Sequence, residues 1–428
     1  MRRPPHPLFA ALLLLAACQS DPVTGKRYYS PLGNDYASQD RFIRENFIAE
    51  LRVAADGGLL PEPEVAAACA EIFERVAAAV PAEHRRGFTY HFALSASPDV
   101  NAYTYGGGRV HCHLGLLARC NDAAEFAGVM AHEIGHNSHD HFGQGLGRER
   151  IAGSVIGIGG IAGRPGRKLF ESIGGLVAGV TLVQHTRAQE KEADVRAVEY
   201  TLRAGIDPDG TARFFEGMER DFGDSGREFF QTHPNPGNRV KSIRDHVAER
   251  GGTPPAALRS TPAFDAALAR AREVLPYYER LNAALAGDDP EAVGEAAAAG
   301  SLALPHHAAF HFWLGVVHEA AGDRDLALQR LRAAAALDRT NVLIPVVWSV
   351  VELSAKNWTE AELAASRALA ILPYLPQAYL VRGLARMRLG RTEEAFRDFD
   401  TTLELLPKGE RRELEEALKA NVPGYGAR

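Results

Sequence analysis

Residues 125–141 read EFAGVMAHEIGHNSHDH, and within them His132, Glu133 and His136 form the pattern H-E-x-x-H. On a helix, side chains four residues apart share a face. His132 and His136 can therefore direct two imidazoles at one point, with Glu133 one position round the helix. Two imidazoles and a close carboxylate suit a catalytic zinc ion, which takes nitrogen ligands and needs a base for its bound water. Apolar residues at helical spacing just before the pattern predict a buried helix.

A zinc site of this type needs a third protein ligand from further along the chain. The pattern that supplies it as a histidine six residues after the second His is absent here. Residues 188–197 read AQEKEADVRA, where Glu190 and Asp194 share a helical face. We predict that Glu190 binds zinc and that Asp194 reaches back to orient a ligand histidine. Glu192 is expected to point elsewhere, as a solvated charge.

HEIGH followed by EKEAD resembles the HtpX-like and CAAX-protease-like branch of the gluzincin peptidases, whose second motif reads E-x-x-A-D or E-x-E-A-D. Glu190, Ala193 and Asp194 match that motif position by position. The resemblance implies a mostly α-helical, zincin-like α+β domain with a small sheet, one Zn2+ per chain and hydrolysis of peptide bonds. It implies that Glu190 is the third zinc ligand. It also makes Asp194 a candidate proton donor, although the helical geometry favours an orienting role.

Length and composition set limits on the class of protein. The 428 residues are enough for two or three domains. With 46% hydrophobic and 24% charged residues, the chain is expected to be globular. A net charge of −6 without a basic stripe argues against a nucleic-acid partner. No apolar run is long and glycine-free enough to predict a transmembrane helix.

Residues 1–18 have the features of a targeting segment, with Arg2 and Arg3 before a short apolar run that ends in Leu-Ala-Ala-Cys. This ending resembles a bacterial lipobox, which implies cleavage before Cys18 and acylation of its sulfur. A plain secretory signal, in which Cys18 has no role, is the alternative. Gln19 follows the cysteine and favours the outer membrane. The sequence thus predicts a periplasmic protein with a lipid anchor.

Three further cysteines follow, Cys69, Cys112 and Cys120. The periplasm permits disulfides, but three is an odd number. Cys112 and Cys120 could pair, which would leave one thiol free. Their spacing does not indicate a cysteine zinc site.

Residues 101–117 read NAYTYGGGRVHCHLGLL. The three glycines predict a tight turn, and residues 109–113 alternate as an exposed edge strand would. An edge strand can pair with an extended peptide, and the gluzincin resemblance implies that this one aligns substrate over the zinc. The alternative is a hairpin that only packs. His111 and His113 could contact substrate, but solvated histidines are the favoured interpretation.

Two other segments leave alternatives open. Residues 151–184 are glycine-rich and apolar, which fits either a lid or membrane-touching hairpin, or a helical pair packed inside the domain. Residues 232–236 read THPNP, and the family commonly has His-Pro followed by Arg, which His233, Pro234 and Arg239 match. His233 could be a removable fourth zinc ligand, a hydrogen-bond donor to the oxyanion, or a helix cap. Arg239 could brace the helix of Glu190 or lie on the surface.

Beyond the linker-like residues 251–262, small residues recur with a period of 34, for example Ala327, Ala361 and Ala395. This period resembles the tetratricopeptide repeat (TPR), with units at 308–341, 342–375 and 376–409 and a degenerate unit in 263–300. Such repeats stack into an α-solenoid whose groove binds peptides or proteins. A stabilising cap on the peptidase domain is the alternative.

The order of lipobox, zinc domain and repeats resembles the BepA-type periplasmic metalloproteases. We predict a signal peptide at 1–18, a metallopeptidase domain at 19–250, a linker at 251–262 and a TPR domain at 263–428. The predicted catalytic residues are Glu133, Asp194 and His233. The predicted function is zinc-dependent cleavage of misassembled envelope proteins, reached through the edge strand and the TPR groove, in protein quality control. The alternative is a chaperone for outer-membrane proteins with latent proteolysis.

Overall fold

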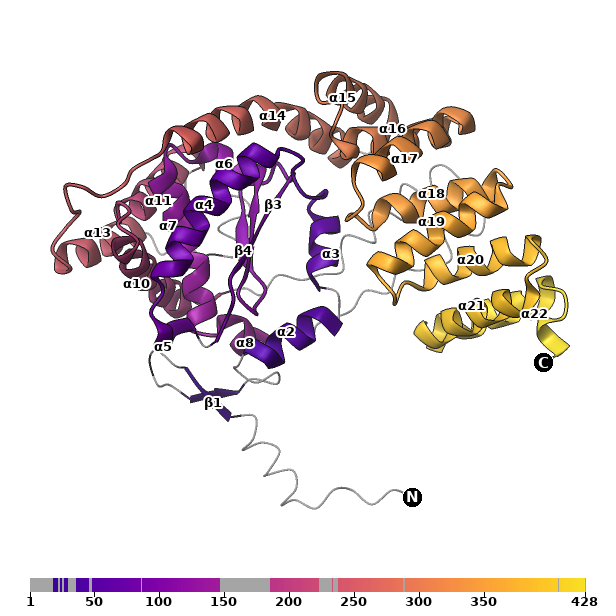
Figure 1. Cartoon of the computed structure of the whole chain (residues 1–428), viewed down its shortest axis with the longest axis horizontal. Coiled ribbons are helices and arrows are strands. Elements are labelled where there is room, and N and C mark those ends of the chain that lie inside the picture. Colours follow the sequence, from indigo (N-terminus) through magenta and orange to yellow (C-terminus); the bar gives the residue numbers. More distant parts are fainter. Residues whose placement is uncertain are drawn as a thin grey trace, which may run out of the picture. The chain divides into compact units, whose positions relative to one another are not determined.

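The structure is a computed structural model that describes residues 18–21, 24, 27–29, 36–45, 48–85, 87–146, 185–222, 233, 238–287, 289–406 and 408–427. Residues 1–17 of the predicted signal segment lie outside these residues. Residues 151–184, for which the sequence leaves open a lid or membrane-touching hairpin or a packed helical pair, also lie outside them. The described chain is mostly helical, with five short strands (Figure 1). None of its helices combines the length and the apolar character needed to cross a membrane.

The chain divides into two compact units. The first comprises Met1–Asn46, Glu62–Ile151 and Thr181–Pro276, and the second comprises Phe47–Pro61, Ala152–Val180 and Tyr277–Arg428. The main helices of the first unit are α4 (Pro63–Ala79), α7 (Ala123–Ser138), α10 (Arg187–Arg203), α11 (Gly210–Phe222) and α13 (Arg239–Glu249). The shorter helices of the first unit are α2 (Tyr36–Glu45), α5 (Ala82–Arg85), α6 (Leu114–Arg119) and α8 (His141–Leu146).

Helix α7, which carries H-E-x-x-H, is buried along its whole length. It packs against α4, α10 and α11. Two glycines allow this close packing. A Cβ at Gly135 would lie 3.1 Å from the Ala193 Cα on α10, and a Cβ at Gly128 would lie 2.4 Å from the Thr211 Oγ1 on α11. Helix α7 begins after Asp122, whose side chain accepts a hydrogen bond from the backbone N–H of Glu125 and so caps the helix.

The three-stranded sheet contains β3 (His91–Ser95), β4 (Ala102–Thr104) and β5 (Arg109–His113) in the order β3-β5-β4. The prediction that residues 109–113 form an edge strand is therefore wrong. Strand β5 is central because β3 pairs with it in parallel and β4 pairs with it antiparallel. His111 and His113 are buried beside Tyr103 instead of solvated. The outer strand next to α7 is β4.

The glycine turn between β4 and β5 is present as predicted. Gly106, Gly107 and Gly108 have φ values of +85°, +58° and +76°. This left-handed backbone favours glycine. At Gly106 a Cβ would also lie 2.4 Å from the Phe142 ring, so no larger residue fits without a shift.

A short N-terminal region also belongs to the first unit. Strands β1 (Cys18–Ser20) and β2 (Arg27–Tyr29) form an antiparallel pair, and α2 follows them. From α2, the Asp40 carboxylate accepts a hydrogen bond of 2.6 Å from Arg109 of β5, and the Gln39 side chain bonds both Asp140 and the backbone N–H of Gly107. Helix α2 therefore holds the glycine turn and the end of the α7 region together.

The second unit contains α3 (Ile48–Ala55) and a helical repeat. The repeat pairs are α16 (Ala308–Ala321) with α17 (Arg324–Leu337), α18 (Leu343–Ser354) with α19 (Trp358–Ile371), and α20 (Pro376–Arg388) with α21 (Thr392–Leu405). They follow α15 (Pro290–Ala303) and precede α22 (Lys408–Asn421) and the short η3 (Tyr425–Ala427). Small residues at the period of 34 lie where paired helices meet. A Cβ at Gly315 would lie 2.7 Å from Leu331 Cγ, and one at Gly383 would lie 2.6 Å from the Phe399 ring.

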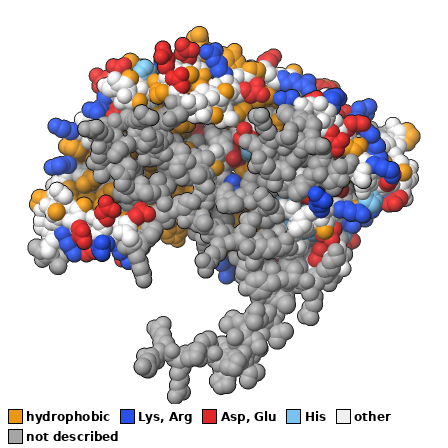
Figure 2. Space-filling model, turned by 180° about the vertical axis from the view of Figure 1, so that it is seen from behind, with side chains coloured by type: hydrophobic (Ala, Val, Ile, Leu, Met, Phe, Trp, Pro, Cys, Tyr) orange, Lys and Arg blue, Asp and Glu red, His pale blue; other side chains and the backbone are white. Residues whose placement is uncertain are grey.

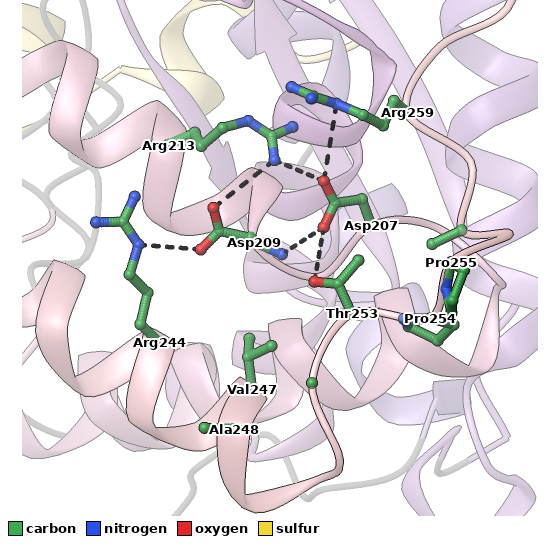
Figure 3. Close-up of a pocket in the computed structure, with 12 residues that line it drawn as sticks. Asp207, Asp209, Arg213, Arg244, Val247, Ala248, Thr253, Pro254, Pro255 and Arg259 are labelled. Atoms are coloured by element: carbon green, nitrogen blue, oxygen red, sulfur yellow. Dashed lines mark hydrogen bonds and ion pairs between the residues drawn. The ribbon is translucent and has the colours of Figure 1, made fainter.

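The division between the units falls inside α14 (Pro262–Ala286), whereas the sequence places a linker at 251–262. The boundary lies later than predicted because residues 253–264 pack within the first unit. The Thr253 hydroxyl donates a hydrogen bond of 3.1 Å to Asp207, in a hollow of about 610 Å³ whose acidic and basic side chains pair with one another (Figure 3). The Phe264 ring of α14 then packs 5.3 Å from the Phe126 ring of α7.

Two further sequence expectations concern cysteines and charge. Cys69, Cys112 and Cys120 are buried free thiols, so the Cys112–Cys120 pairing does not occur. Burial raises the pKa of all three thiols. On the face shown in Figure 2, acidic and basic side chains are interspersed over the described surface.

Candidate metal centre

Helices α7 and α10 bring the predicted ligands together. The Nε2 atoms of His132 and His136 lie 3.0 Å apart. The Glu190 carboxylate lies across from them, with Oε2 3.4 Å from the His132 Nε2 and Oε1 3.4 Å from the His136 Nε2. Ligand atoms around a tetrahedral zinc at ~2.0 Å are about 3.3 Å apart, so this donor set fits the ion. All three side chains are fully buried.

The start of α10 fixes the position of Glu190. Thr186 caps the helix, because its side chain accepts a hydrogen bond from the backbone N–H of Gln189 and the Gln189 side chain accepts one from the backbone N–H of Thr186. This reciprocal capping box satisfies two amide groups that a helix start leaves without partners. Glu190 therefore follows a well-defined helix start and not a frayed end.

Asp194 and Arg239 surround the ligands. Asp194 Oδ1 lies 3.0 Å from the His132 Nδ1, which leaves the His132 Nε2 for a metal. The Arg239 guanidinium donates to both Asp194 oxygens at 2.8 Å, and its Nη2 is 3.0 Å from Glu190 Oε2. It also stacks 3.9 Å from the centre of the Phe215 ring. Arg239 is thus buried and braces α10, and it does not lie on the surface.

The pKa values reflect this mixture of burial and charge. Burial and the Arg239 charge oppose protonation of His132, but hydrogen bonds to Asp194 and Glu190 outweigh them and raise its pKa to about 9. Burial would raise the pKa of Glu190, yet His233 and Arg239 hold it well below its usual range. Burial lowers the pKa of His136 well below its ordinary value. Without a metal, the site therefore favours an ionised Glu190, a protonated His132 and a neutral His136.

Glu133 differs from the other carboxylates of the site. It is fully buried, and neither of its oxygens has a hydrogen-bond partner among the described residues. The His233 Nε2 lies 3.5 Å from Glu133 Oε1. Burial raises the pKa of Glu133. Because a buried carboxylate without hydrogen bonds is unfavourable, the presence of Glu133 beside the ligands fits a base that acts on a water bound there.

His233 also lies in the cluster. Its Nδ1 is 3.2 Å from Glu190 Oε1 and 3.4 Å from the His132 Nε2. The structure thus brings four possible ligand atoms within 4.8 Å of one another, close enough to hold one metal ion. They belong to His132, His136, Glu190 and His233. His233 does not cap the helix that follows, because α13 begins at Arg239 after Asn238.

Two further imidazoles, those of His141 and His185, lie against His136, and Glu192 contacts His141. His141 Nδ1 lies 2.7 Å from the His136 Nδ1, and the His141 Nε2 lies 3.3 Å from Glu192 Oε2. Glu192 points away from the ligand cluster, as predicted, but it contacts His141 and is not a solvated charge. The His185 ring stacks 3.8 Å from the His136 ring. The two-residue spacing puts Glu192 on a different face of α10 from Glu190, and the sequence does not show that His141 lies against that face.

Part of the chain is similar in sequence to known metallopeptidases. Residues 63–247 match the sequence profile of peptidase family M48. A Vibrio cholerae relative is 28% identical over 202 residues, which are 44% of this chain and 40% of that protein. The Escherichia coli K12 beta-barrel assembly-enhancing protease is 26% identical over 167 residues, covering 37% of this chain and 34% of that protein. The mitochondrial metalloendopeptidase OMA1 of Schizosaccharomyces pombe is 26% identical over 154 residues, covering 36% and 45%.

The matched region contains the zinc-helix pattern, Glu190, Asp194, His233 and Arg239. The chain spans less than half the length of each of these three relatives. The matched region ends before the helical repeat begins. The segment from α4 to α13 is therefore a domain of peptidase family M48, and the candidate metal centre lies within it.

Proposed function

We propose that this chain is a zinc-dependent endopeptidase of the bacterial cell envelope that cleaves misassembled envelope proteins. One observation carries the proposal. Two imidazole nitrogens and the Glu190 carboxylate converge at 3.0–3.4 Å, beside a buried carboxylate, Glu133, without hydrogen-bond partners in the described chain. Nitrogen and oxygen donors at these separations suit zinc.

His132, His136 and Glu190 would hold the metal. Zinc bound there would act as a Lewis acid and lower the pKa of a bound water towards ~7. Glu133 is placed to accept onto a carboxylate oxygen the proton of a water that would attack the peptide carbonyl carbon, and the raised pKa of Glu133 makes it the stronger base. Glu133 returns the proton to the leaving amine nitrogen as the C–N bond breaks.

Asp194 supports this chemistry without handling the substrate. Both of its oxygens accept hydrogen bonds from Arg239, and Oδ1 also contacts His132 on the ring edge opposite the ligand nitrogen. The family role of a proton donor therefore suits Asp194 less well than an orienting role. His233, between Glu190 and Glu133, can serve as a removable fourth ligand or as a donor to the oxyanion.

The substrate would be an extended polypeptide. Strand β4 is the outer strand of the described sheet on the side of α7, so a peptide added along it would run next to the zinc helix. We therefore propose that the substrate pairs with β4 instead of with residues 109–113, because β5 already has β3 on one side and β4 on the other.

The cellular setting is proposed from the sequence and the relatives. The lipobox-like ending at Cys18 favours acylation and anchoring to the outer membrane from the periplasm. The name of the Escherichia coli relative, a beta-barrel assembly-enhancing protease, fits envelope proteins as substrates. The helical repeat, proposed to be of the TPR type, would bind client polypeptides in its groove.

A chaperone or assembly factor with latent proteolysis is the second candidate. The specific observation in its favour is the repeat itself, with three helical pairs spaced by about 34 residues. Such arrays bind proteins and perform no chemistry. Under this alternative, loss of hydrolysis would leave the biological activity of the chain intact.

The test compares three forms of the full-length protein on fluorescein-labelled casein, an unfolded polypeptide. Glu133→Gln should reduce cleavage by ~10²–10⁴-fold while zinc content stays at the wild-type level. Glu74→Gln, at an exposed position of α4, is the matched control and should cleave normally. Wild-type cleavage by Glu133→Gln would remove Glu133 from the mechanism. Full complementation of a deletion strain by Glu133→Gln would favour the chaperone.

A further inference from the structure

The two ligand histidines are supported in different ways. His132 contacts the carboxylate of Asp194 directly, at 3.0 Å from its Nδ1. The His136 Nδ1 contacts another imidazole, the Nδ1 of His141, at 2.7 Å. The His141 Nε2 then lies 3.3 Å from Glu192 Oε2. Each ligand histidine is therefore supported by an acidic side chain of α10. Asp194 contacts His132 directly, and Glu192 is linked to His136 through His141.

The proton positions along this second path follow from the chemistry of a neutral imidazole, which carries one N–H. If the His136 Nε2 binds a metal, its proton lies on Nδ1 and is donated to the His141 Nδ1. The proton of a neutral His141 then lies on Nε2 and is donated to Glu192. Each donor meets one acceptor, and the Glu192 carboxylate sets the direction of the whole path.

We propose that His141 and Glu192 are a positioning pair that orients His136 as a metal ligand, in parallel with the action of Asp194 on His132. The inference rests on the proposed metal site. It gives all three acidic residues of the E-x-E-A-D segment a place at the site, with Glu190 as ligand, Asp194 behind His132 and Glu192 behind His141.

The surrounding rings hold His141 in plane. The His139 ring stacks on the His141 ring with 5.2 Å between centroids and 12° between planes. His139 is in turn fixed by Asp21, whose Oδ2 lies 2.9 Å from its Nδ1. The His185 ring stacks on the His136 ring. His141 and His139 are both fully buried, so neither ring can turn away to solvent.

A different use of the same residues is a second metal site, because His139, His141 and Glu192 lie close enough together to hold an ion. The path of protons argues against it. With His136 bound to a metal, the His141 Nε2 carries a proton and has no lone pair to offer. The positioning role thus predicts one zinc per chain, whereas a second site predicts two.

Zinc affinity, measured by competition with a chromophoric chelator, tests the pair without reference to catalysis. His141→Phe should weaken zinc binding ~10–100-fold and Glu192→Ala about 10-fold. The double variant should bind no more weakly than His141→Phe alone, because both changes cut the same path. In contrast, Glu192→Ala and Asp194→Asn act on different ligands, so the product of their separate effects is expected for that pair. Lys191→Ala, exposed on the same helix, should match the wild type.

His141→Asn keeps the test decisive if His141→Phe does not fold. Its amide oxygen lies near the place of the imidazole Nδ1 and can still accept from His136, but the link to Glu192 is lost. Adding Glu192→Ala to His141→Asn should therefore change nothing. A further loss on that addition, or two zinc ions per wild-type chain, overturns the positioning pair. A wild-type protein that binds no zinc instead refutes the proposed function.

Discussion

Two buried glutamates, one in each unit, show how differently the two halves of the chain treat charge. Glu352 of α18 accepts hydrogen bonds from Arg332 at 2.9 and 2.7 Å, from the Trp348 indole at 2.7 Å and from Asn357 at 2.8 Å. Glu133 of α7 is as deeply buried, but its oxygens have no hydrogen-bond partner among the described residues.

The difference separates a structural polar group from a functional one. A buried carboxylate loses its hydration, and Glu352 recovers that loss through four donors. Glu133 does not recover it within the described chain, so its position is unfavourable for folding alone. In the helical repeat, Glu352 lies in a satisfied hydrogen-bond network, while Glu133 of the peptidase unit keeps acceptor capacity next to the candidate ligands for a water and a substrate.

The largest difference in stability between the two units is expected from one arginine in each. Arg239→Leu leaves Asp194 and Glu190 buried without their shared cation, which should lower the unfolding free energy of the metal-free protein by about 3–5 kcal/mol. Arg382→Leu should lower it by only about 1 kcal/mol, because Asp398 keeps a bond of 2.8 Å from Arg386. Denaturant unfolding followed by circular dichroism measures both. Equal losses would contradict the contrast between the units.

A pH series gives the next largest effect. The pKa of His132, about 9 in the folded metal-free protein, lies above its ordinary value of 6.5. Its contribution to stability is therefore complete below pH 6.5 and is lost as the pH rises through 9, by ~3 kcal/mol at most. Burial lowers the pKa of His141 to about 4, so its contribution is lost in the other direction, as the pH falls from 6.5 towards 4.

Metal-free protein should consequently be most stable near pH 6.5, as judged by circular dichroism of chelator-treated samples. Zinc should remove the alkaline loss, because a ligand His132 has already given up its proton. An alkaline loss of equal size with and without zinc would contradict a ligand role for His132.

The smallest difference between the units comes from the two glutamates themselves. Glu352→Gln turns an acceptor into a donor that faces existing donors, and it should cost about 2 kcal/mol. Glu133→Gln should leave stability unchanged or raise it, since a neutral amide is easier to bury than an uncompensated carboxylate. All three tryptophans, Trp313, Trp348 and Trp358, lie in the second unit, so their fluorescence measures the effect of Glu352→Gln. Circular dichroism during denaturant unfolding measures the effect of Glu133→Gln in the first unit. Destabilisation by Glu133→Gln as large as that by Glu352→Gln would remove the distinction.

Local spacing explains which parts of this arrangement the sequence predicts. The ligand pair on α7 and the pair Glu190 and Asp194 on α10 follow from helical periodicity, because residues four apart share a face whatever surrounds them. The repeat follows from a period of 34 residues for the same reason, since each helical pair contacts its neighbours in sequence.

Other parts depend on pairings that no local pattern records. Strand β5 looks like an edge strand by alternation, but β3, more than ten residues earlier, covers it in parallel. The burial of Arg239 requires α13 to pack on α10. His141 reaches His136 only because the chain turns after α7 through Asp140, which has φ of 54°. Glu192 appears solvated from sequence because that turn is not visible there.

The most direct test of the account is the zinc content of purified wild-type and Glu190→Ala protein after dialysis against a weak chelator, measured by atomic emission. We expect one zinc per wild-type chain and a loss of most of it in Glu190→Ala. Tryptophan fluorescence should show that the repeat remains folded in the variant. A wild-type chain that holds no zinc, or a Glu190→Ala chain that holds it as tightly as the wild type, would contradict the convergence of α7 and α10 on one metal ion.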